Sequence, residues 1–280
     1  MKYYLTALVS CHNCATYFPE WLEFHLLQGF EHFIIQDQFS TDGIKELLQS
    51  YVDDGIVSFV DIPESVKDTA FGMNSIKQGI DSQKGISKWL WVASLDEFVF
   101  LPNGGKVFDF LKGYEDYSSL AIQWVLFNSN GHMKRTSGLV TERFTNIYSE
   151  FPLHCKSIVQ PDMVAGFQNP HAFIPIAGKI AVDENKNPQP VAHPTAFNAS
   201  KIRINHYWAL SREEYLHKMS QGRSDIANCF GRFRDYYEEM WVGAHSLPPV
   251  FDNMILCSGL IEQVKENMVK RFGIRKELGL

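Results

Sequence analysis

A regular alternation of strand-like and helix-like segments over the first 130 residues is the feature that most constrains the fold. Runs rich in β-branched and aromatic residues predict strands at residues 3–10, 31–37, 56–63, 88–102 and 118–131. Apolar residues at helical spacing predict helices between them at residues 18–29, 43–55, 74–84 and 107–114. Strands and helices that alternate in this way build βαβ units. We therefore expect an α/β fold with a mainly parallel sheet covered by helices on both faces.

The alternation weakens after about residue 150. Further strands and helices are predicted at residues 156–161, 201–208, 211–222 and 252–272. The first of these helices begins with a capping box of Ser211 and Glu214. We therefore expect one domain over residues 1–225 and a C-terminal helical extension over residues 226–280.

Net charge and cysteine content narrow the class of protein. The chain of 280 residues has a formal net charge of −6, which argues against nucleic-acid binding because that needs a basic face. No segment reaches the roughly 18 apolar residues of a membrane helix. The five cysteines are odd in number and scattered, which is typical of a reducing compartment rather than of a disulfide framework. We therefore expect a cytoplasmic protein.

Polar residues at the ends of the predicted strands form the candidate site, because ligands of parallel sheets bind at the carboxyl ends of the strands. These residues are 11–13, 36–38, 94–97 and 128–132. Asp96 ends an apolar strand, where one carboxylate can hold a divalent ion that bridges phosphates. Asp37 either accepts a hydrogen bond from a ribose or base or is a turn acid. For Asp42 we expect the role of N-cap to the helix at 43–55.

The motif CHNC at residues 11–14 has three interpretations. A strand, CxxC and a helix in that order are the layout of a redox dithiol, but this chain is far longer than a thioredoxin-like domain. A zinc clip needs a second pair of ligands, and the sequence has no other CxxC. The third interpretation, which we favour, is that both thiols are small apolar residues in the first loop.

His206 ends the strand predicted at residues 201–208 and has aromatic neighbours. A single histidine in such a place is more often a packing residue than a ligand. Paired with Asp96, it becomes a candidate metal or phosphate ligand.

Several longer motifs follow one another along the chain. They are EWLEFH at residues 20–25, IIQDQFSTDG at 34–43, LDEF at 95–98, KSIV at 156–159 and INHYWALSREEYLHK at 204–218. In this order they resemble bacterial glycosyltransferases of the GT-A fold, family 2-like chains related to glycosyltransferase family 92. The resemblance spans roughly residues 4–225.

The resemblance implies a hexosyltransferase with a GT-A-like fold. It would move a sugar from a UDP-sugar to a cell-surface glycan or lipid-linked acceptor, with Mn²⁺ or Mg²⁺ as cofactor. Residues 1–130 would bind the nucleotide-sugar and residues 131–225 the acceptor, while Asp96 and His206 match metal ligands. Ser94 replaces the first acid of the family's D-x-D motif, which leaves the metal dependence open. The implied nucleotide-sugar contacts are Ser10, His12, Asn13, Asp37, Ser94 and Lys156.

The catalytic base is expected among three carboxylates. An inverting transferase needs a carboxylate within hydrogen-bond reach of the acceptor hydroxyl. Glu142 follows the fifth predicted strand, roughly where GT-A folds place the base, and is the first candidate. Glu97 is the second and Asp162 the third.

Three other classes of protein stay open. A catalytically inactive glycan- or nucleotide-binding module is compatible with the missing acid at Ser94. A sugar nucleotidyltransferase would want a glycine-rich, basic first loop, and CHNCATY at residues 11–17 is neither. A redox protein would need Cys11 to have a low pKa.

The C-terminal segment MVKRFGIRKELGL, residues 268–280, mixes basic and apolar residues. This composition suits a peripheral contact with a membrane surface. We expect such a contact at the inner face of the membrane, near a lipid-linked acceptor.

Overall fold

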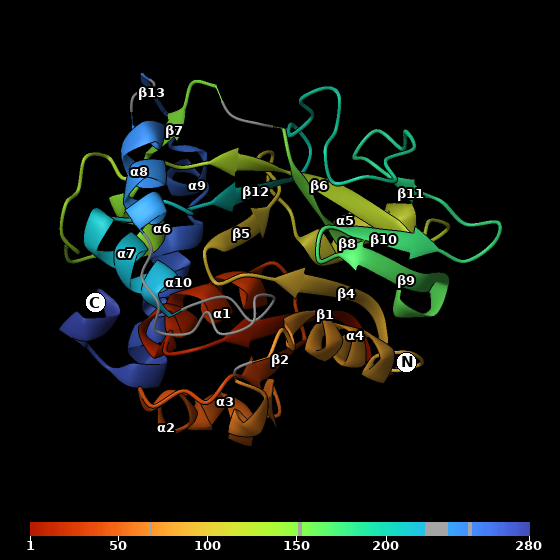
Figure 1. Cartoon of the computed structure of the whole chain (residues 1–280), viewed down its shortest axis with the longest axis horizontal. Helices are drawn as coiled ribbons and strands as arrows, with labels where there is room; N and C mark the ends of the chain where they lie inside the picture. The colour runs from red at the N-terminus through yellow and green to blue at the C-terminus, as the bar shows by residue number, and fades with distance from the viewer. Residues whose placement is uncertain (68, 151–152, 222–234, 246–247) are drawn as a thin grey trace.

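The computed structural model describes residues 1–67, 69–150, 153–221, 235–245 and 248–280. Within these ranges one sheet of nine strands runs through the chain (Figure 1), in the order β3-β2-β1-β4-β8-β6-β12-β5 with β11 beside β6. Its strands are β1 (Tyr3–Cys11), β2 (His32–Asp37), β3 (Val57–Asp61), β4 (Ser87–Ala93), β5 (Glu97–Phe100), β6 (Ser119–Leu126), β8 (Cys155–Val159), β11 (Ala181–Val182) and β12 (Arg203–His206).

The sheet is mixed but mostly parallel. β1 pairs in parallel with β2 and β4, and β2 does so with β3. β6 is parallel to β11 and β12. β8 runs antiparallel between β4 and β6, and β5 runs antiparallel to β12. This topology confirms the predicted α/β fold with a mainly parallel sheet flanked by helices.

Helices cover both faces of the sheet. Ala7 and Val9 of β1 lie in the larger core together with Trp21 of α1 (Phe18–Leu27). Leu8 lies instead in a second core with Ile80 of α4 (Gly72–Ser82). Because successive residues of a strand point to opposite faces, α1 and α4 lie on opposite sides of β1, as the alternation of strands and helices predicts.

The C-terminal helices return to the N-terminal half of the chain. The helix α10 (Leu260–Phe272) lies beside α1 (Figure 1). It contributes Ile261, Val264 and Met268 to the same core as Trp21 of α1. The other helices are α2 (Ile44–Leu47), α3 (Gln49–Asp53), α5 (Val107–Leu111), α6 (Val140–Arg143), α7 (Arg212–Ser220), α8 (Asp235–Ala244) and α9 (Met254–Cys257). Two further sheets have two strands each. In one, β9 (Val164–Asn169) pairs with β10 (Ala172–Pro175), and in the other, β7 (Asn146–Tyr148) pairs with β13 (Pro249–Phe251). The expected domain boundary after residue 225 lies outside the described residues.

The prediction of a single strand at residues 88–102 is wrong. The chain turns at Ser94–Asp96, and its second half becomes β5, which pairs with β12 at the far end of the sheet. The apolar run is continuous because β5 is fully buried and β4 is buried at every residue except Lys88. Only the polar turn between them marks the break.

Two predicted helices are also divided. Residues 43–55 form α2 and α3, and Gly43 with a φ of 77° is the N-cap residue. The expected cap by Asp42 is wrong, because its carboxylate accepts a hydrogen bond from Ala15 N at 2.7 Å. Residues 252–272 form α9 and α10, which are separated at Gly259, where φ is 71°. Glycine adopts this left-handed backbone conformation more readily than other residues, and the conformation interrupts the helix between α9 and α10.

Candidate active site

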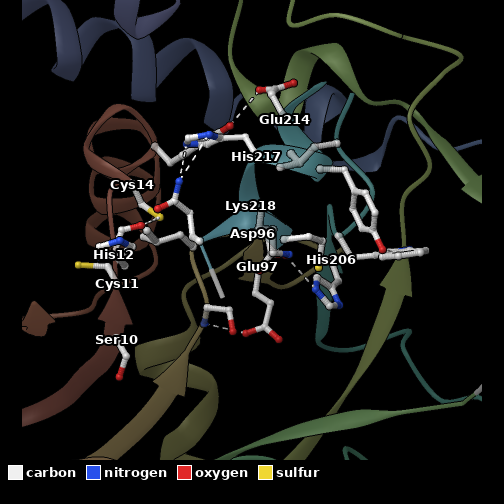
Figure 2. A pocket seen from close by; sticks show the side chains of 18 of the residues that line it. Ser10, Cys11, His12, Cys14, Asp96, Glu97, His206, Glu214, His217 and Lys218 are labelled. Carbon is white, nitrogen blue, oxygen red and sulfur yellow. Dashed lines mark hydrogen bonds and ion pairs between the residues drawn. The ribbon is translucent and has the colours of Figure 1, made fainter. Parts of the chain in front are cut away.

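A cavity of about 540 Å³ opens at the carboxyl ends of β1 and β4. Its lining also includes residues of β8, β12 and α7. Figure 2 shows Asp96, Glu97, His206 and Lys218 brought together in it from segments far apart in the sequence. The volume lies within the roughly 300–1,000 Å³ of small-ligand sites. Of the residues expected to contact a nucleotide-sugar, the lining contains Ser10, His12, Asn13, Ser94 and Lys156.

The loop after β1 is tied to the loop after β2. Asn13 has a φ of 51°, a conformation that asparagine tolerates better than most residues. Its backbone N–H donates to Ser40 Oγ at 3.0 Å, and its Oδ1 accepts from Thr41 N at 2.8 Å. His12 Nδ1 lies 2.6 Å from Gln38 O. These bonds hold His12 and Asn13 at the cavity wall.

Ser10 and Asp37 stand at the ends of neighbouring strands but differ in their access to the cavity. Ser10 lines it and donates to Gln36 Oε1 at 2.9 Å. Asp37 lies outside the lining, where its Oδ1 accepts from Ser40 N at 3.0 Å. Lys45 Nζ lies 4.0 Å from the other carboxylate oxygen. Asp37 therefore supports the turn that holds the Asn13 loop.

The two thiols of the first loop are poor nucleophiles. Burial raises the pKa of Cys11 well above its usual range, and it raises the pKa of Cys14 to about 11. Redox dithiols need a lowered thiol pKa, so the geometry argues against the redox interpretation. The described residues contain no group of three or more His, Cys, Asp or Glu that could hold a metal.

The turn between β4 and β5 binds a buried lysine of β8. Lys156 Nζ lies 2.8 Å from Ser94 Oγ and 2.6 Å from Glu97 Oε2. The Lys156 and Glu97 side chains are 4% and 1% exposed. Ser94 N–H donates to the same Glu97 oxygen at 2.9 Å. Among the described residues nothing hydrogen-bonds to Glu97 Oε1, so one oxygen of this buried carboxylate keeps a free acceptor site.

Asp96 carries a buried negative charge beside two basic groups. Its Oδ2 lies 3.2 Å from His206 Nε2 and forms an ion pair with the Lys218 ammonium. Burial alone would raise the pKa of Asp96, but the charges of Lys218 and His206 hold that pKa well below its usual range. The structure thus brings together the two expected metal ligands and adds a cation of the chain itself.

The expected Mn²⁺ or Mg²⁺ does not fit the side chains as they lie. The Asp96 oxygen that faces His206 is already paired with Lys218. Ser94, at the position of the missing acid, accepts from the Lys156 ammonium rather than offering a second carboxylate. A divalent ion at Asp96 would therefore lie next to an ammonium group, with two of the chain's side chains as ligands. The metal stays a prediction.

Glu142 and Asp162, two of the three candidate bases, lie away from the cavity. Glu142 Oε2 accepts from Leu139 N at 3.2 Å at the start of α6, and its Oε1 pairs with Lys265 of α10. Asp162 accepts from Gly85 N at 2.9 Å. Neither residue belongs to the lining, whereas Glu97 does.

Several lining residues were missed by the sequence reasoning. They include Tyr17, Trp124, His171, Trp208, Glu214 and Lys218. Glu214 and Lys218 are four residues apart on a predicted helix, so the sequence could have placed them on one face. Nothing in the sequence placed that face against the Asp96 turn.

Burial lowers the pKa of His171 to about 3, so this ring is neutral at physiological pH.

The sequence matches the model of glycosyltransferase family 92 over residues 12–220, and no curated protein matches it. The crystal structure of S. aureus TarS 1-349 has 11% identity and a TM-score of 0.38, with 88% of this chain and 72% of that one covered. TarS 1-349 in complex with UDP-GlcNAc gives 10% identity, the same TM-score and the same coverage.

A longer TarS structure has 12% identity and a TM-score of 0.35, with 58% of this chain covered. This chain spans only 29% of its length, and 48% of TarS 1-349 in complex with UDP. TM-scores this low carry no argument about the ligands of this chain.

Proposed function

The chain belongs to glycosyltransferase family 92, and on that premise we propose that it transfers a hexose from a nucleotide-sugar to an acceptor hydroxyl. We take a UDP-sugar as the donor and a glycan or lipid-linked molecule as the acceptor, as in the synthesis of a bacterial cell-surface polysaccharide. The observation that carries the proposal is the convergence of strand-end residues in one cavity. Ser10, His12, Asn13, Ser94, Asp96, Glu97, Lys156 and His206 all line it.

Glu97 is the base in this proposal. Its Oε2 is fixed by Lys156 and Ser94, while its Oε1 is buried and has no hydrogen-bond partner within the described residues, so the acceptor must displace the side chains that cover it. Oε1 would take the proton of the acceptor hydroxyl while the acceptor oxygen attacks the anomeric carbon. The bond to the diphosphate breaks with its electron pair on the leaving group, and the anomeric configuration inverts. Glu142, the first candidate from the sequence, gives way to Glu97 because its carboxylate caps α6 and pairs with Lys265.

The proposed site of action is the cytoplasm, at the inner face of the membrane. The helices of the described ranges are all too short or too polar to span a bilayer. The expected surface contact through residues 268–280 has partial support, since Ile274 is 80% exposed while Met268 and Leu278 are buried in the core. Arg271 is paired with Glu23 and Asp54, which leaves fewer free charges for a lipid surface.

A module that binds the donor without turning it over is the second candidate. Each described carboxylate of the lining has a basic partner: Lys218 for Asp96, Lys156 for Glu97 and Arg143 for Glu214. Such pairing is also what a purely structural polar cluster would show. Turnover of a donor separates the two candidates.

Thermal shifts with UDP, GDP, CDP, ADP and dTDP test the donor site. A ligand at 100 times its dissociation constant adds about 2.7 kcal/mol to the free energy of unfolding, which is several degrees in Tm for a chain of this size. We expect UDP to give this shift with the wild type. Gln221→Trp should abolish it because Gln221 lines the cavity, while Gln263→Trp should keep it because Gln263 is an exposed residue of α10 outside the cavity. No shift with any nucleotide would contradict the proposal.

A further inference from the structure

The cation beside Asp96 comes from the chain itself. Lys218 lies on α7, one turn after Glu214, and its ammonium contacts Asp96 Oδ2 across the cavity (Figure 2). The Lys218 side chain is 39% exposed, whereas that of Asp96 is 9% exposed. Lys218 therefore keeps part of its side chain open to solvent, and that side chain lines the cavity.

The helix that carries Lys218 is firmly held. Ser211 caps α7 by accepting from Glu214 N, and the Glu214 carboxylate accepts from both Arg143 terminal nitrogens at 2.8 Å. Arg143 and Glu214 are each 4% exposed in their side chains. Tyr215, the next residue, is fully buried. The backbone of α7 is thus fixed against the cavity wall.

We propose that the Lys218 ammonium takes the place of a divalent ion and binds the diphosphate of the donor. This inference rests on the function proposed above. An ammonium has three N–H donors, and Asp96 Oδ2 uses one of them. The others can reach phosphate oxygens, for which lysine serves as a point charge. The resulting order of carboxylate, cation and diphosphate is the one that a bound metal would create.

Lys156 is not placed to bind the diphosphate in the same way. Its side chain is 4% exposed, and its charge is taken up by the buried Glu97 and by Ser94. Lys218 has a single described carboxylate partner, and its partly exposed side chain lines the cavity. Charge on a departing diphosphate is stabilised by a cation that is held in place and can still contact the diphosphate. Of the two cavity lysines, Lys218 is the one placed to supply it.

Calorimetric titration with UDP, in EDTA and then in Mn²⁺, tests the inference. The wild type should bind UDP in EDTA, and Mn²⁺ should leave the affinity nearly unchanged. Lys218→Met should weaken UDP binding roughly 10- to 100-fold, as expected for the loss of a charged hydrogen bond, and Lys218→Arg should recover most of that loss. Uridine, which has no phosphate, should bind wild type and Lys218→Met equally, which separates a lost contact from a damaged fold.

Lys265→Met is the matched control. Lys265 is also 39% exposed and also pairs closely with a carboxylate, Glu142, but it lies outside the cavity. Its removal should leave UDP binding unchanged. Binding of UDP to the wild type only with Mn²⁺ would overturn the role of Lys218 and leave the transferase proposal standing. Equal binding to wild type and Lys218→Met in EDTA would overturn it as well. No binding to the wild type in either buffer would overturn both proposals.

Discussion

Lys156 Nζ lies 2.6 Å from Glu97 Oε2, and the two side chains are nearly inaccessible to solvent. One comes from β8, in the second half of the chain, and the other follows the turn after β4. The pair therefore joins the two halves of the sheet at the floor of the cavity. It also fixes the carboxylate that we propose as the base.

Removal of one partner of this pair should be costly. Lys156→Met leaves Glu97 buried without its cation, and the loss of one partner of a buried ion pair typically costs about 3–5 kcal/mol. Lys156→Met with Glu97→Gln should recover part of this stability, because no buried charge then remains. Urea unfolding of both variants measures their free energies of unfolding. Lys265→Met, from a half-exposed pair, should cost less than about 1 kcal/mol, and a similar cost for Lys156→Met would contradict the account.

Glu97→Gln should slow turnover without harming donor binding. Loss of a general base costs about 10²- to 10⁴-fold in rate. The amide keeps the size of the side chain but leaves Lys156 buried without its anion, so the variant should also lose about 3–5 kcal/mol of stability and is assayed at a temperature at which it is folded. Glu142→Gln, which alters a cap at the start of α6 outside the cavity, should leave turnover within about twofold of wild type. Steady-state kinetics with saturating donor measures both. Loss of turnover in Glu142→Gln alone would return the role of base to that residue.

The thiols of the first loop should be dispensable for activity. Burial raises the pKa of both Cys11 and Cys14, so little thiolate forms near neutral pH. Cys14→Ser should retain turnover, and iodoacetamide should label Cys14 far more slowly than the exposed Cys257. Mass spectrometry of the labelled chain gives the relative rates. Rapid labelling of Cys14 would revive the redox interpretation.

Stability should fall as the pH drops below about 6.5. Burial lowers the pKa of His25 to about 3, and its Nδ1 lies 2.7 Å from Trp21 O. The unfolded chain binds a proton at this residue below its ordinary pKa of about 6.5, while the folded chain does not. Between the folded and unfolded pKa values, each such histidine lowers the free energy of unfolding by about 1.4 kcal/mol for each unit that the pH falls. Urea unfolding at pH 7.5 and 5.5 should show a smaller loss in His25→Gln, and identical losses would contradict the assignment.

The alternation of strands and helices was enough to predict the fold class, because βαβ units follow from local spacing. The break between β4 and β5 was not predictable, since both strands are buried and apolar and the turn between them is only three residues long. The position of β5 beside β12 depends on a pairing between residues about a hundred positions apart. Such long-range pairing leaves no local signal.

The candidate site was partly predictable for the same reason. Strand ends gave Asn13, Ser94 and Asp96 from the sequence, because the carboxyl ends of parallel strands share one edge of the sheet. Glu142 was ranked above Glu97 because it follows the fifth predicted strand, roughly where GT-A folds place the base, but its carboxylate contacts Leu139 N and Lys265 of α10. Lys218 could not be predicted, because its role depends on how α7 packs beside the Asp96 turn.

Release of UDP from a set of UDP-hexoses is the most direct test of the transferase account. The account predicts that the wild type releases UDP from at least one of them. Glu97→Gln should do so at least roughly 100-fold more slowly, although it binds UDP as tightly as the wild type. A wild-type chain that binds UDP but releases none from any UDP-hexose, with or without Mn²⁺ and a glycan acceptor, would contradict the account and identify a binding module.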